Sequence, residues 1–196
     1  WWLRSQSMIC RARPDSAATV PSTMPNRSRS PSGAQPSGSG CATSTGTQGP
    51  NASADLEATK GNTARGTVSF RQTGERVRVQ ASVSGLTPGP HGFHIHDQGD
   101  CSSGDGASAG GHFNPLAKPH AHPQAAERHA GDLPQLTADA AGKATLDFEI
   151  DLLRIGTGPT NIVGRSVIVH GGPDDFKSQP AGNSGPRVAC GVIRAG

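Results

Sequence analysis

The stretch of residues 67–84 reads TVSFRQTGERVRVQASVS, and its pattern sets the fold class of this chain. In residues 75–84 apolar side chains alternate strictly with polar ones, which is typical of an antiparallel strand with one buried face. Residues 67–72 form a second such run, and Thr73-Gly74 between the runs suits a tight turn. The stretch therefore predicts a β-hairpin. The predicted buried face of its second strand carries Val77, Val79, Ala81 and Val83.

Short strands of the same kind follow downstream. The chain has 27 glycines and 16 prolines, a composition that disfavours helices and favours short strands joined by turns. Strands at this spacing predict one all-β sandwich or barrel with two long loops. The further predicted strands are a short one containing His94 and His96, and residues 144–151, 163–170 and 187–194; residues 171–186 form one of the long loops.

Seven of the eight histidines lie between residues 91 and 132, and only His170 lies outside. His94 and His96 flank one apolar residue, so a strand would place both imidazoles on the same face, where they could share one ion. Neutral imidazole suits copper and zinc, whereas calcium and magnesium prefer oxygen ligands. The stretch predicts a loop around a metal ion; surface histidines in a polar loop are the alternative. Four further candidate ligands follow in a Gly- and Pro-rich segment: His112, His120, His129 and Asp132.

Residues 1–60 are predicted to be a disordered leader ahead of a domain over residues 61–196. Within residues 1–50, 26 side chains are Ser, Thr, Pro or Gly, so little apolar surface is available for a core. The segment lacks the apolar run of about 7 to 15 residues that a signal peptide needs. Because the chain does not begin with Met, we expect a fragment, a misplaced start or a frame error upstream of roughly Cys41. Cys41 follows Ser-Gly, as a lipid-anchored cysteine would, but no apolar stretch precedes it.

The net charge of +3 is unevenly distributed. Residues 1–65 carry seven basic and three acidic side chains, a net +4, whereas residues 66–196 carry eleven and twelve, a net −1. A nearly neutral domain without a basic run or a set of stacking aromatic residues gives no case for binding DNA or RNA. No apolar run is long enough to form a transmembrane segment.

Of the four cysteines, Cys10 and Cys41 fall in the predicted leader, while Cys101 and Cys190 fall in the domain. A disulfide between Cys101 and Cys190 is the natural pairing. Closing a loop of about 90 residues is worth roughly 4–5 kcal/mol in the chain-entropy model. Such a bond indicates an oxidising compartment. Two reduced and separately buried thiols are the alternative.

Five strings whose order and combination are specific stand out: HGFHIH at 91–96, AGGHFNP at 109–115, ERHAGDL at 127–133, SVIVH at 166–170 and GPRVACGVI at 185–193. Through them the chain, from about residue 66 to residue 193, resembles the copper–zinc superoxide dismutases, particularly the bacterial ones. The resemblance implies a Greek-key β-sandwich or barrel of immunoglobulin-like type, with one metal-binding and one electrostatic loop. This family is itself a standard example of that architecture.

The resemblance implies a superoxide dismutase that converts superoxide to oxygen and hydrogen peroxide by cycling between Cu(II) and Cu(I). Zinc, which is redox-inert, would order the loop. His112 would bridge the two metals and pass a proton to the departing peroxide. The implied ligands are His94, His96, His112 and His170 for copper, and His112, His120, His129 and Asp132 for zinc.

Two further functional residues follow from the resemblance. Asp174 matches the carboxylate that links a copper histidine to a zinc histidine and orients both. Arg187 matches the arginine that attracts the anionic substrate to copper; an ordinary strand-end arginine is the alternative. His91 is expected to pack and to form hydrogen bonds, and His122, which has no counterpart in the family, to be exposed in a loop.

The sequence departs from the family pattern in its loops and its leader. The segment between Cys101 and His112 is longer than in animal enzymes, which leaves its shape open. Residues 171–186 have few acidic side chains and carry Lys177 in their middle, so the electrostatic field that guides the substrate could be built differently. Residues 1–60 match nothing in the family.

The resemblance and the cysteines imply a periplasmic or otherwise exported protein, although no signal peptide is recognisable. Bacterial members of the family are monomers or dimers, so a homodimer stays open. Two other functions stand beside the enzyme: a copper-binding or copper-delivery module on the same fold without turnover, and a structural sandwich that binds zinc incidentally. The full ligand set, together with Asp174 and Arg187, favours the enzyme.

Overall fold

The predicted hairpin is present in the computed structural model, which describes residues 49–196. It consists of β2 (Arg65–Thr73) and β3 (Arg76–Ser84), which pair antiparallel along their whole length. The turn falls at Gly74 and Glu75, one residue later than predicted. Gly74 has a φ of 57°, a conformation that a residue without a Cβ adopts readily. The predicted inward face of β3 is buried, as shown by Val77, Val79, Ala81 and Val83.

The predicted domain boundary after residue 60 is wrong, because β1 (Asn51–Ala58) lies before it. The strand alternates strictly, with Ala52, Ala54 and Leu56 buried and the residues between them exposed. Two of these three core residues are alanines, whose small side chains give a weak apolar signal among Ser, Asp and Glu. The alternation is therefore easy to overlook in the sequence. Residues 1–48, with Cys10 and Cys41, lie outside the described residues.

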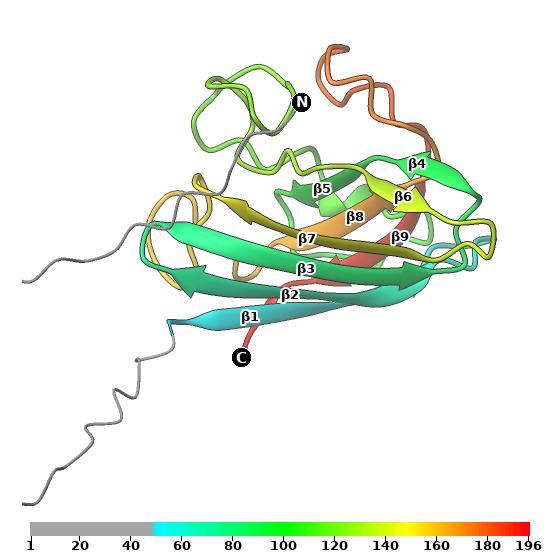
Figure 1. Ribbon diagram of the computed structural model, residues 1–196, viewed down its shortest axis with the longest axis horizontal. Coiled ribbons are helices and arrows are strands. Elements are labelled where there is room, and N and C mark those ends of the chain that lie inside the picture. Colours follow the sequence, from blue (N-terminus) through cyan, green and yellow to red (C-terminus); the bar gives the residue numbers. More distant parts are fainter. Residues whose placement is uncertain (1–48) are drawn as a thin grey trace, which may run out of the picture. The chain divides into compact units, whose positions relative to one another are not determined.

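The strands form one curled antiparallel sheet in the order β5-β8-β9-β1-β2-β3-β7, and β10 pairs with β1 (Figure 1). β1 joins the two layers of this sheet, because residues 51–56 pair with β2 while Glu57 and Ala58 pair with β9. β4 and β6 form a separate two-stranded sheet. The remaining bounds are β4 (Gly89–His91), β5 (Phe93–His96), β6 (Leu136–Ala138), β7 (Ala144–Ile150), β8 (Ser166–His170), β9 (Arg187–Val192) and β10 (Arg194–Ala195).

The core lies between the inward faces of the curled sheet, and it confirms the predicted all-β class. Phe70 from β2, Val79 from β3, Ile95 from β5 and Val167 from β8 are all buried in one apolar cluster. Within residues 49–196 the only helix is the short 3₁₀ turn Ala107–Ala109. No helix in this part of the chain is long and apolar enough to cross a membrane.

The site is positioned by β5 and β8, which pair with each other and are buried on both faces. β8 begins three residues later than the predicted strand over 163–170, and Gly164 turns the chain there with a φ of 82°. Two long connections leave these strands: residues 97–135 between β5 and β6, and residues 171–186 between β8 and β9. Parts of both rise above the sheet in the view of Figure 1.

Candidate metal centre

The strand β5 brings the candidate ligands together. His94 and His96 lie within it, and His170 ends the neighbouring β8. Backbone hydrogen bonds hold the loop after β5 against the middle of the same strand. This pairing places His112 opposite His96 and Asp132 opposite His94. Residues that are far apart in sequence therefore meet around one short strand.

The first cluster consists of His94, His96, His112 and His170, whose nearest ligand atoms all lie within 4.8 Å of one another. One nitrogen of each ring is buried and has no hydrogen-bond partner: Nδ1 of His94 and Nε2 of the other three. Buried polar atoms are nearly always paired, so four unpaired ones in one place call for an explanation.

Hydrogen-bond acceptors determine which nitrogen of each ring carries the proton, because each acceptor contacts the nitrogen that points away from the cluster. Three rings have such an acceptor, and it fixes the tautomer so that the unpartnered nitrogen carries a lone pair. The contacts are His94 Nε2 to Asp174 Oδ2 at 2.7 Å, His96 Nδ1 to the Gly110 carbonyl at 2.9 Å, and His170 Nδ1 to the Gly185 carbonyl at 3.2 Å. Converging lone pairs of this kind fit a metal ion with imidazole ligands.

The second cluster consists of His112, His120, His129 and Asp132. Asp132 Oδ1 lies 3.0 Å from His112 Nδ1, 2.9 Å from His120 Nδ1 and 3.4 Å from His129 Nδ1. Ligands at about 2.0–2.2 Å from a tetrahedral zinc stand roughly 3.3–3.6 Å apart. The observed separations are near this range, so three nitrogens and one carboxylate oxygen fit a zinc ion.

His112 belongs to both clusters. Its Nδ1 faces Asp132 in the second cluster, while its buried Nε2 is one of the four unpartnered nitrogens of the first. Its ring centroid lies 3.9 Å from that of His94 and 5.2 Å from that of His120. A single imidazole thus offers one nitrogen to each cluster.

Asp174 connects the two clusters on another side. Its Oδ2 lies 2.7 Å from His94 Nε2 and its Oδ1 lies 2.9 Å from His120 Nε2. The carboxylate is buried, and its backbone N–H donates to Gln135 Oε1. Gly182 passes directly over this pair with a φ of 65°, and a Cβ at that position would overlap both Asp174 Oδ1 and His120 Nε2.

Burial keeps the first cluster neutral, because it lowers the pKa of His170 to about 3 and that of His112 to about 4. Neutral imidazole is the form that binds metals. At His120 burial also opposes the charged form, but hydrogen bonds to Asp132 and Asp174 outweigh it and raise the pKa to about 9. Burial likewise opposes ionisation of both carboxylates, yet their histidine partners hold each carboxyl pKa well below its usual range. Both carboxylates are therefore ionised.

A cavity of about 320 Å³ opens onto the first cluster. Arg187 is the one Lys or Arg among its lining residues, and no carboxylate lines it. Burial lowers the pKa of Arg187, although Asp105 opposes the shift. A cavity with one guanidinium and no carboxylate suits a small anion. Its lining consists of His96, Gly111, His112, Asn114, His129, His170, Pro180, Ala181 and Arg187.

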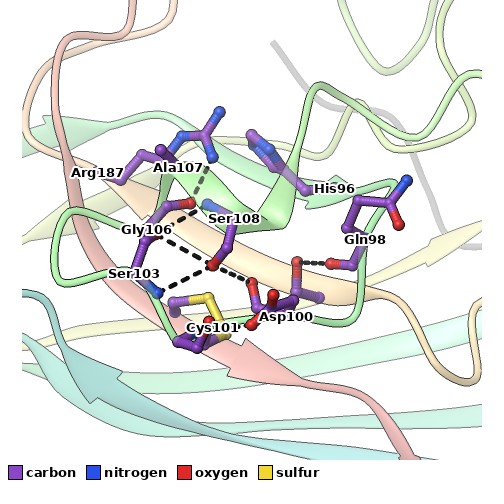
Figure 2. Close-up of a disulfide and its surroundings, with 12 residues drawn as sticks. His96, Gln98, Asp100, Cys101, Ser103, Gly106, Ala107, Ser108 and Arg187 are labelled. Carbon is purple, nitrogen blue, oxygen red and sulfur yellow. Dashed lines mark hydrogen bonds between the residues drawn. A yellow bond between two sulfur atoms is a disulfide. The ribbon is translucent and has the colours of Figure 1, made fainter.

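The predicted disulfide between Cys101 and Cys190 is present, and one of its cysteines lies on the strand that carries Arg187 (Figure 2). Cys190 follows Arg187 by three residues on β9, and Cys101 opens the segment that contains Gly106 and Gly110. The Arg187 guanidinium donates to the carbonyls of these two glycines, at 2.5 Å each. The disulfide thus joins the strand that carries the arginine to the loop that accepts its hydrogen bonds.

The two other histidines of the described chain lie outside both clusters. His91 is buried, with Nδ1 2.7 Å from the carbonyl of His170 and Nε2 2.8 Å from the carbonyl of Thr87. His122 is exposed, and its ring centroid lies 4.7 Å from that of Phe176. These surroundings agree with the structural and exposed positions expected from the sequence.

Three residues at the site were not singled out by the sequence: Gln135, Gln179 and Gly182. Gln135 contacts the backbone of Asp174, and Gln179 contacts the backbone of His120. Gly182 lies against the side chains of Asp174 and His120. An isolated glutamine in a loop belongs to no periodic pattern. A glycine among many others gives no signal of its own, so the folded loop was needed to find all three.

Comparison with protein families places most of this chain in one of them. Residues 64–193 match the family model described as copper/zinc superoxide dismutase. This match contains every residue of both clusters, together with Asp174, Arg187 and the two disulfide cysteines.

Individual relatives and a solved structure agree with this match. A superoxide dismutase [Cu-Zn] of Deinococcus radiodurans is 43% identical over 143 residues, which cover 66% of this chain and 77% of the relative. A superoxide dismutase [Cu-Zn] 2 of Brassica juncea is 46% identical over 139 residues, which cover 66% of this chain and 88% of the relative. A crystal structure of the clock protein EA4 superposes with a TM-score of 0.68 at 41% identity, covering 76% of this chain and 96% of that one.

Proposed function

Because this chain belongs to the copper/zinc superoxide dismutase family, we propose that its two histidine clusters are a copper site and a zinc site. The activity of the family, the conversion of superoxide to oxygen and hydrogen peroxide with copper and zinc, is the activity of this chain. We assign His94, His96, His112 and His170 to copper, and His112, His120, His129 and Asp132 to zinc.

The observation that carries this assignment is the set of four buried, unpartnered imidazole nitrogens in the first cluster. Imidazole suits copper, and an all-nitrogen set leaves the carboxylate Asp132 to the other metal. The second cluster has three nitrogens and one carboxylate oxygen at separations that suit a tetrahedral zinc. The two donor sets therefore differ in the way that the two metals require.

The residues of the chain perform distinct parts of the reaction. A copper ion held by the first cluster would supply the one-electron redox chemistry that the conversion of superoxide needs. Arg187 carries a positive charge in the cavity wall, and it attracts and orients the anionic substrate. His112 Nε2 faces the first cluster and can hold a proton for the departing peroxide. Asp174 keeps the ring protons of His94 and His120 on Nε2, so that Nδ1 of His94 points to the first cluster and Nδ1 of His120 to the second, where a bound zinc would displace the Nδ1 proton.

The test is the decay of superoxide catalysed by the full chain loaded with one copper and one zinc. Metal-free and zinc-only protein serve as controls. We expect fast decay that depends on copper, loss of copper binding in His96→Ala and loss of zinc binding in His129→Ala. Absence of decay with both metals demonstrably bound would transfer the function to copper binding or delivery.

We further propose that the chain acts in the periplasm. The disulfide supports export, because such bonds persist in oxidising compartments, and one of the relatives is bacterial. Fractionation of cells that make the full chain tests the location. The sequence left the choice between monomer and homodimer open, and the mass of the native protein in solution tests it.

A further inference from the structure

The side chain of Gln179 pairs with the backbone of His120. Its Oε1 accepts a hydrogen bond from the His120 N–H at 2.8 Å, and its Nε2 donates to the His120 carbonyl at 2.8 Å. The same Nε2 group also donates to the carbonyl of Lys177 at 3.1 Å, inside the loop of residues 171–186. One amide therefore makes the two hydrogen bonds that a neighbouring strand would make.

His120 needs such a partner because no regular structure holds it. It lies between Pro119 and Pro123 in a segment without strands. In the described part of the chain, no backbone group bonds to its N–H or its carbonyl. The side chain of Gln179 supplies what the sheet supplies at His94 and His96.

We propose that Gln179 is a positioning residue for the zinc site, an inference that rests on the assignment of His120 as a zinc ligand. The loop of residues 171–186 holds His120 at two points. Asp174 fixes the ring through Nε2, while Gln179 fixes the backbone from which the ring projects. With both contacts in place, His120 Nδ1 stays 2.9 Å from Asp132 Oδ1, inside the second cluster.

The coupling works in both directions. A zinc ion that holds His120 also holds the partner of Gln179, so zinc binding and the order of the loop of residues 171–186 favour each other. This loop contributes Pro180 and Ala181 to the wall of the cavity. Gln179 thus connects zinc binding to the shape of the substrate entrance without touching a metal ligand atom.

The experiment measures zinc affinity in the full chain by competition with a chelator, and records the absorption spectrum of cobalt(II) bound in place of zinc. Residues that orient metal ligands typically change affinity by about 10- to 100-fold when substituted. We expect Gln179→Ala to weaken zinc about tenfold and to change the cobalt spectrum. Gln179→Glu keeps an acceptor for the His120 N–H and loses the donor to its carbonyl, so we expect an intermediate affinity.

The controls separate this role from others. Gln124, an exposed glutamine four residues after His120, should tolerate alanine with unchanged zinc affinity. Copper affinity should stay within about threefold in every Gln179 variant, since β5 and β8 hold three of the four proposed copper ligands. An equal loss of both metals would indicate general destabilisation and overturn the proposal. Gln179→Glu decides the matter if the alanine variant does not fold.

The result that sinks the inference alone is a zinc affinity of Gln179→Ala within twofold of the wild type, together with a large loss in His120→Ala. If His120→Ala itself binds zinc normally, then the proposed zinc ligand set is wrong, and the role of Gln179 fails with it.

Discussion

At the scale of single residues, one carboxylate sets the chemistry of two histidines in different clusters. Asp174 accepts the Nε2 protons of His94 and His120, so each ring presents Nδ1 to its own cluster. The tautomer of a metal-binding imidazole follows from the hydrogen bond on its other nitrogen. One side chain from the loop of residues 171–186 therefore aligns one candidate ligand for each metal.

Gly182→Ala tests how closely the backbone approaches this pair. The new Cβ would overlap Asp174 Oδ1 and His120 Nε2, at a φ of 65° that is strained for alanine. We expect a loss of about 1–3 kcal/mol in stability and at least tenfold weaker zinc binding. Gly158→Ala is the matched control, because its φ is 87° but its Cβ would meet nothing within 4 Å. Equal zinc affinity in the two variants would contradict the prediction.

Arg187→Ala should slow superoxide removal and flatten its dependence on salt. The guanidinium is the one Lys or Arg side chain in the cavity lining, and steering by charge raises association rates by about 10- to 1000-fold at low salt. Superoxide dismutase is a standard example of such steering. Stopped-flow decay at several ionic strengths measures the effect. Arg187→Lys keeps the positive charge but loses the paired hydrogen bonds to the two glycine carbonyls, so it should retain more of the salt dependence than Arg187→Ala. Unchanged kinetics in Arg187→Ala would exclude a role of Arg187 in attracting the substrate.

At the scale of elements, β1 is the strand on which both layers depend. It pairs with β2 along residues 51–56 and with β9 at Glu57 and Ala58, next to the strand end that carries Arg187. β1 also buries Ala52, Ala54 and Leu56 in the common core. A strand in the middle of a sheet cannot be removed without exposing the edges of both neighbours.

Removal of residues 1–58 should therefore unfold the domain. Removal of β1 loses three core side chains and three strand pairings, with β2, β9 and β10. We expect this loss to cost most or all of the roughly 5–15 kcal/mol by which a folded domain is typically stable. Circular dichroism during heating measures the result. A chain that lacks only residues 1–48 keeps all ten strands found in residues 49–196, and we expect it to melt cooperatively. Cooperative melting of the shorter chain at the same temperature would contradict the importance of β1.

The disulfide connects β9 to the loop that follows β5. Replacing both Cys101 and Cys190 with serine should lower the free energy of unfolding by about 2–5 kcal/mol. The carbonyls of Gly106 and Gly110 would then be held less firmly against Arg187, so superoxide decay should slow as well. Urea unfolding and stopped-flow decay measure the two effects separately. Full activity with reduced stability would show that Arg187 does not need the bond.

At the scale of the whole molecule, the site is a meeting point of segments far apart in the chain. β5 and β8 supply His94, His96 and His170 from a rigid pair of buried strands. The other ligands come from loop residues 112–132, and the loop of residues 171–186 covers them through Asp174 and Gln179. The sheet positions three of the four histidines of the first cluster, whereas the second cluster depends on contacts between two loops.

Removal of both metals should lower the melting temperature. A ligand that binds only the folded state stabilises it by about 2.7–4.1 kcal/mol at 100 to 1000 times its Kd. For a domain of this size, each kcal/mol corresponds to about 2–4 °C, so we expect a decrease of about 5–15 °C. Calorimetry before and after chelation measures the change, with re-addition of zinc alone as the control. An unchanged melting temperature would mean that the second cluster does not bind metal tightly.

The sequence alone determined the fold class and most of the candidate site. Alternation in residues 75–84 records which side of a strand faces the core, because burial acts on every second residue. The histidine strings carried a family pattern that pointed to both clusters, to Asp174 and to Arg187. The signal failed at β1, where the core positions Ala52 and Ala54 are too small to stand out from their polar neighbours.

Only the tertiary structure decided which backbones approach one another. Gln179, Gly182 and Gln135 matter because the loop of residues 171–186 folds over His120, a contact between residues about 60 positions apart in the chain. Side-chain periodicity reports local burial, and it contains no information on where a loop without periodic structure will lie. The geometry of that loop comes from many long-range contacts formed together, and the positions that hold the second cluster follow from it.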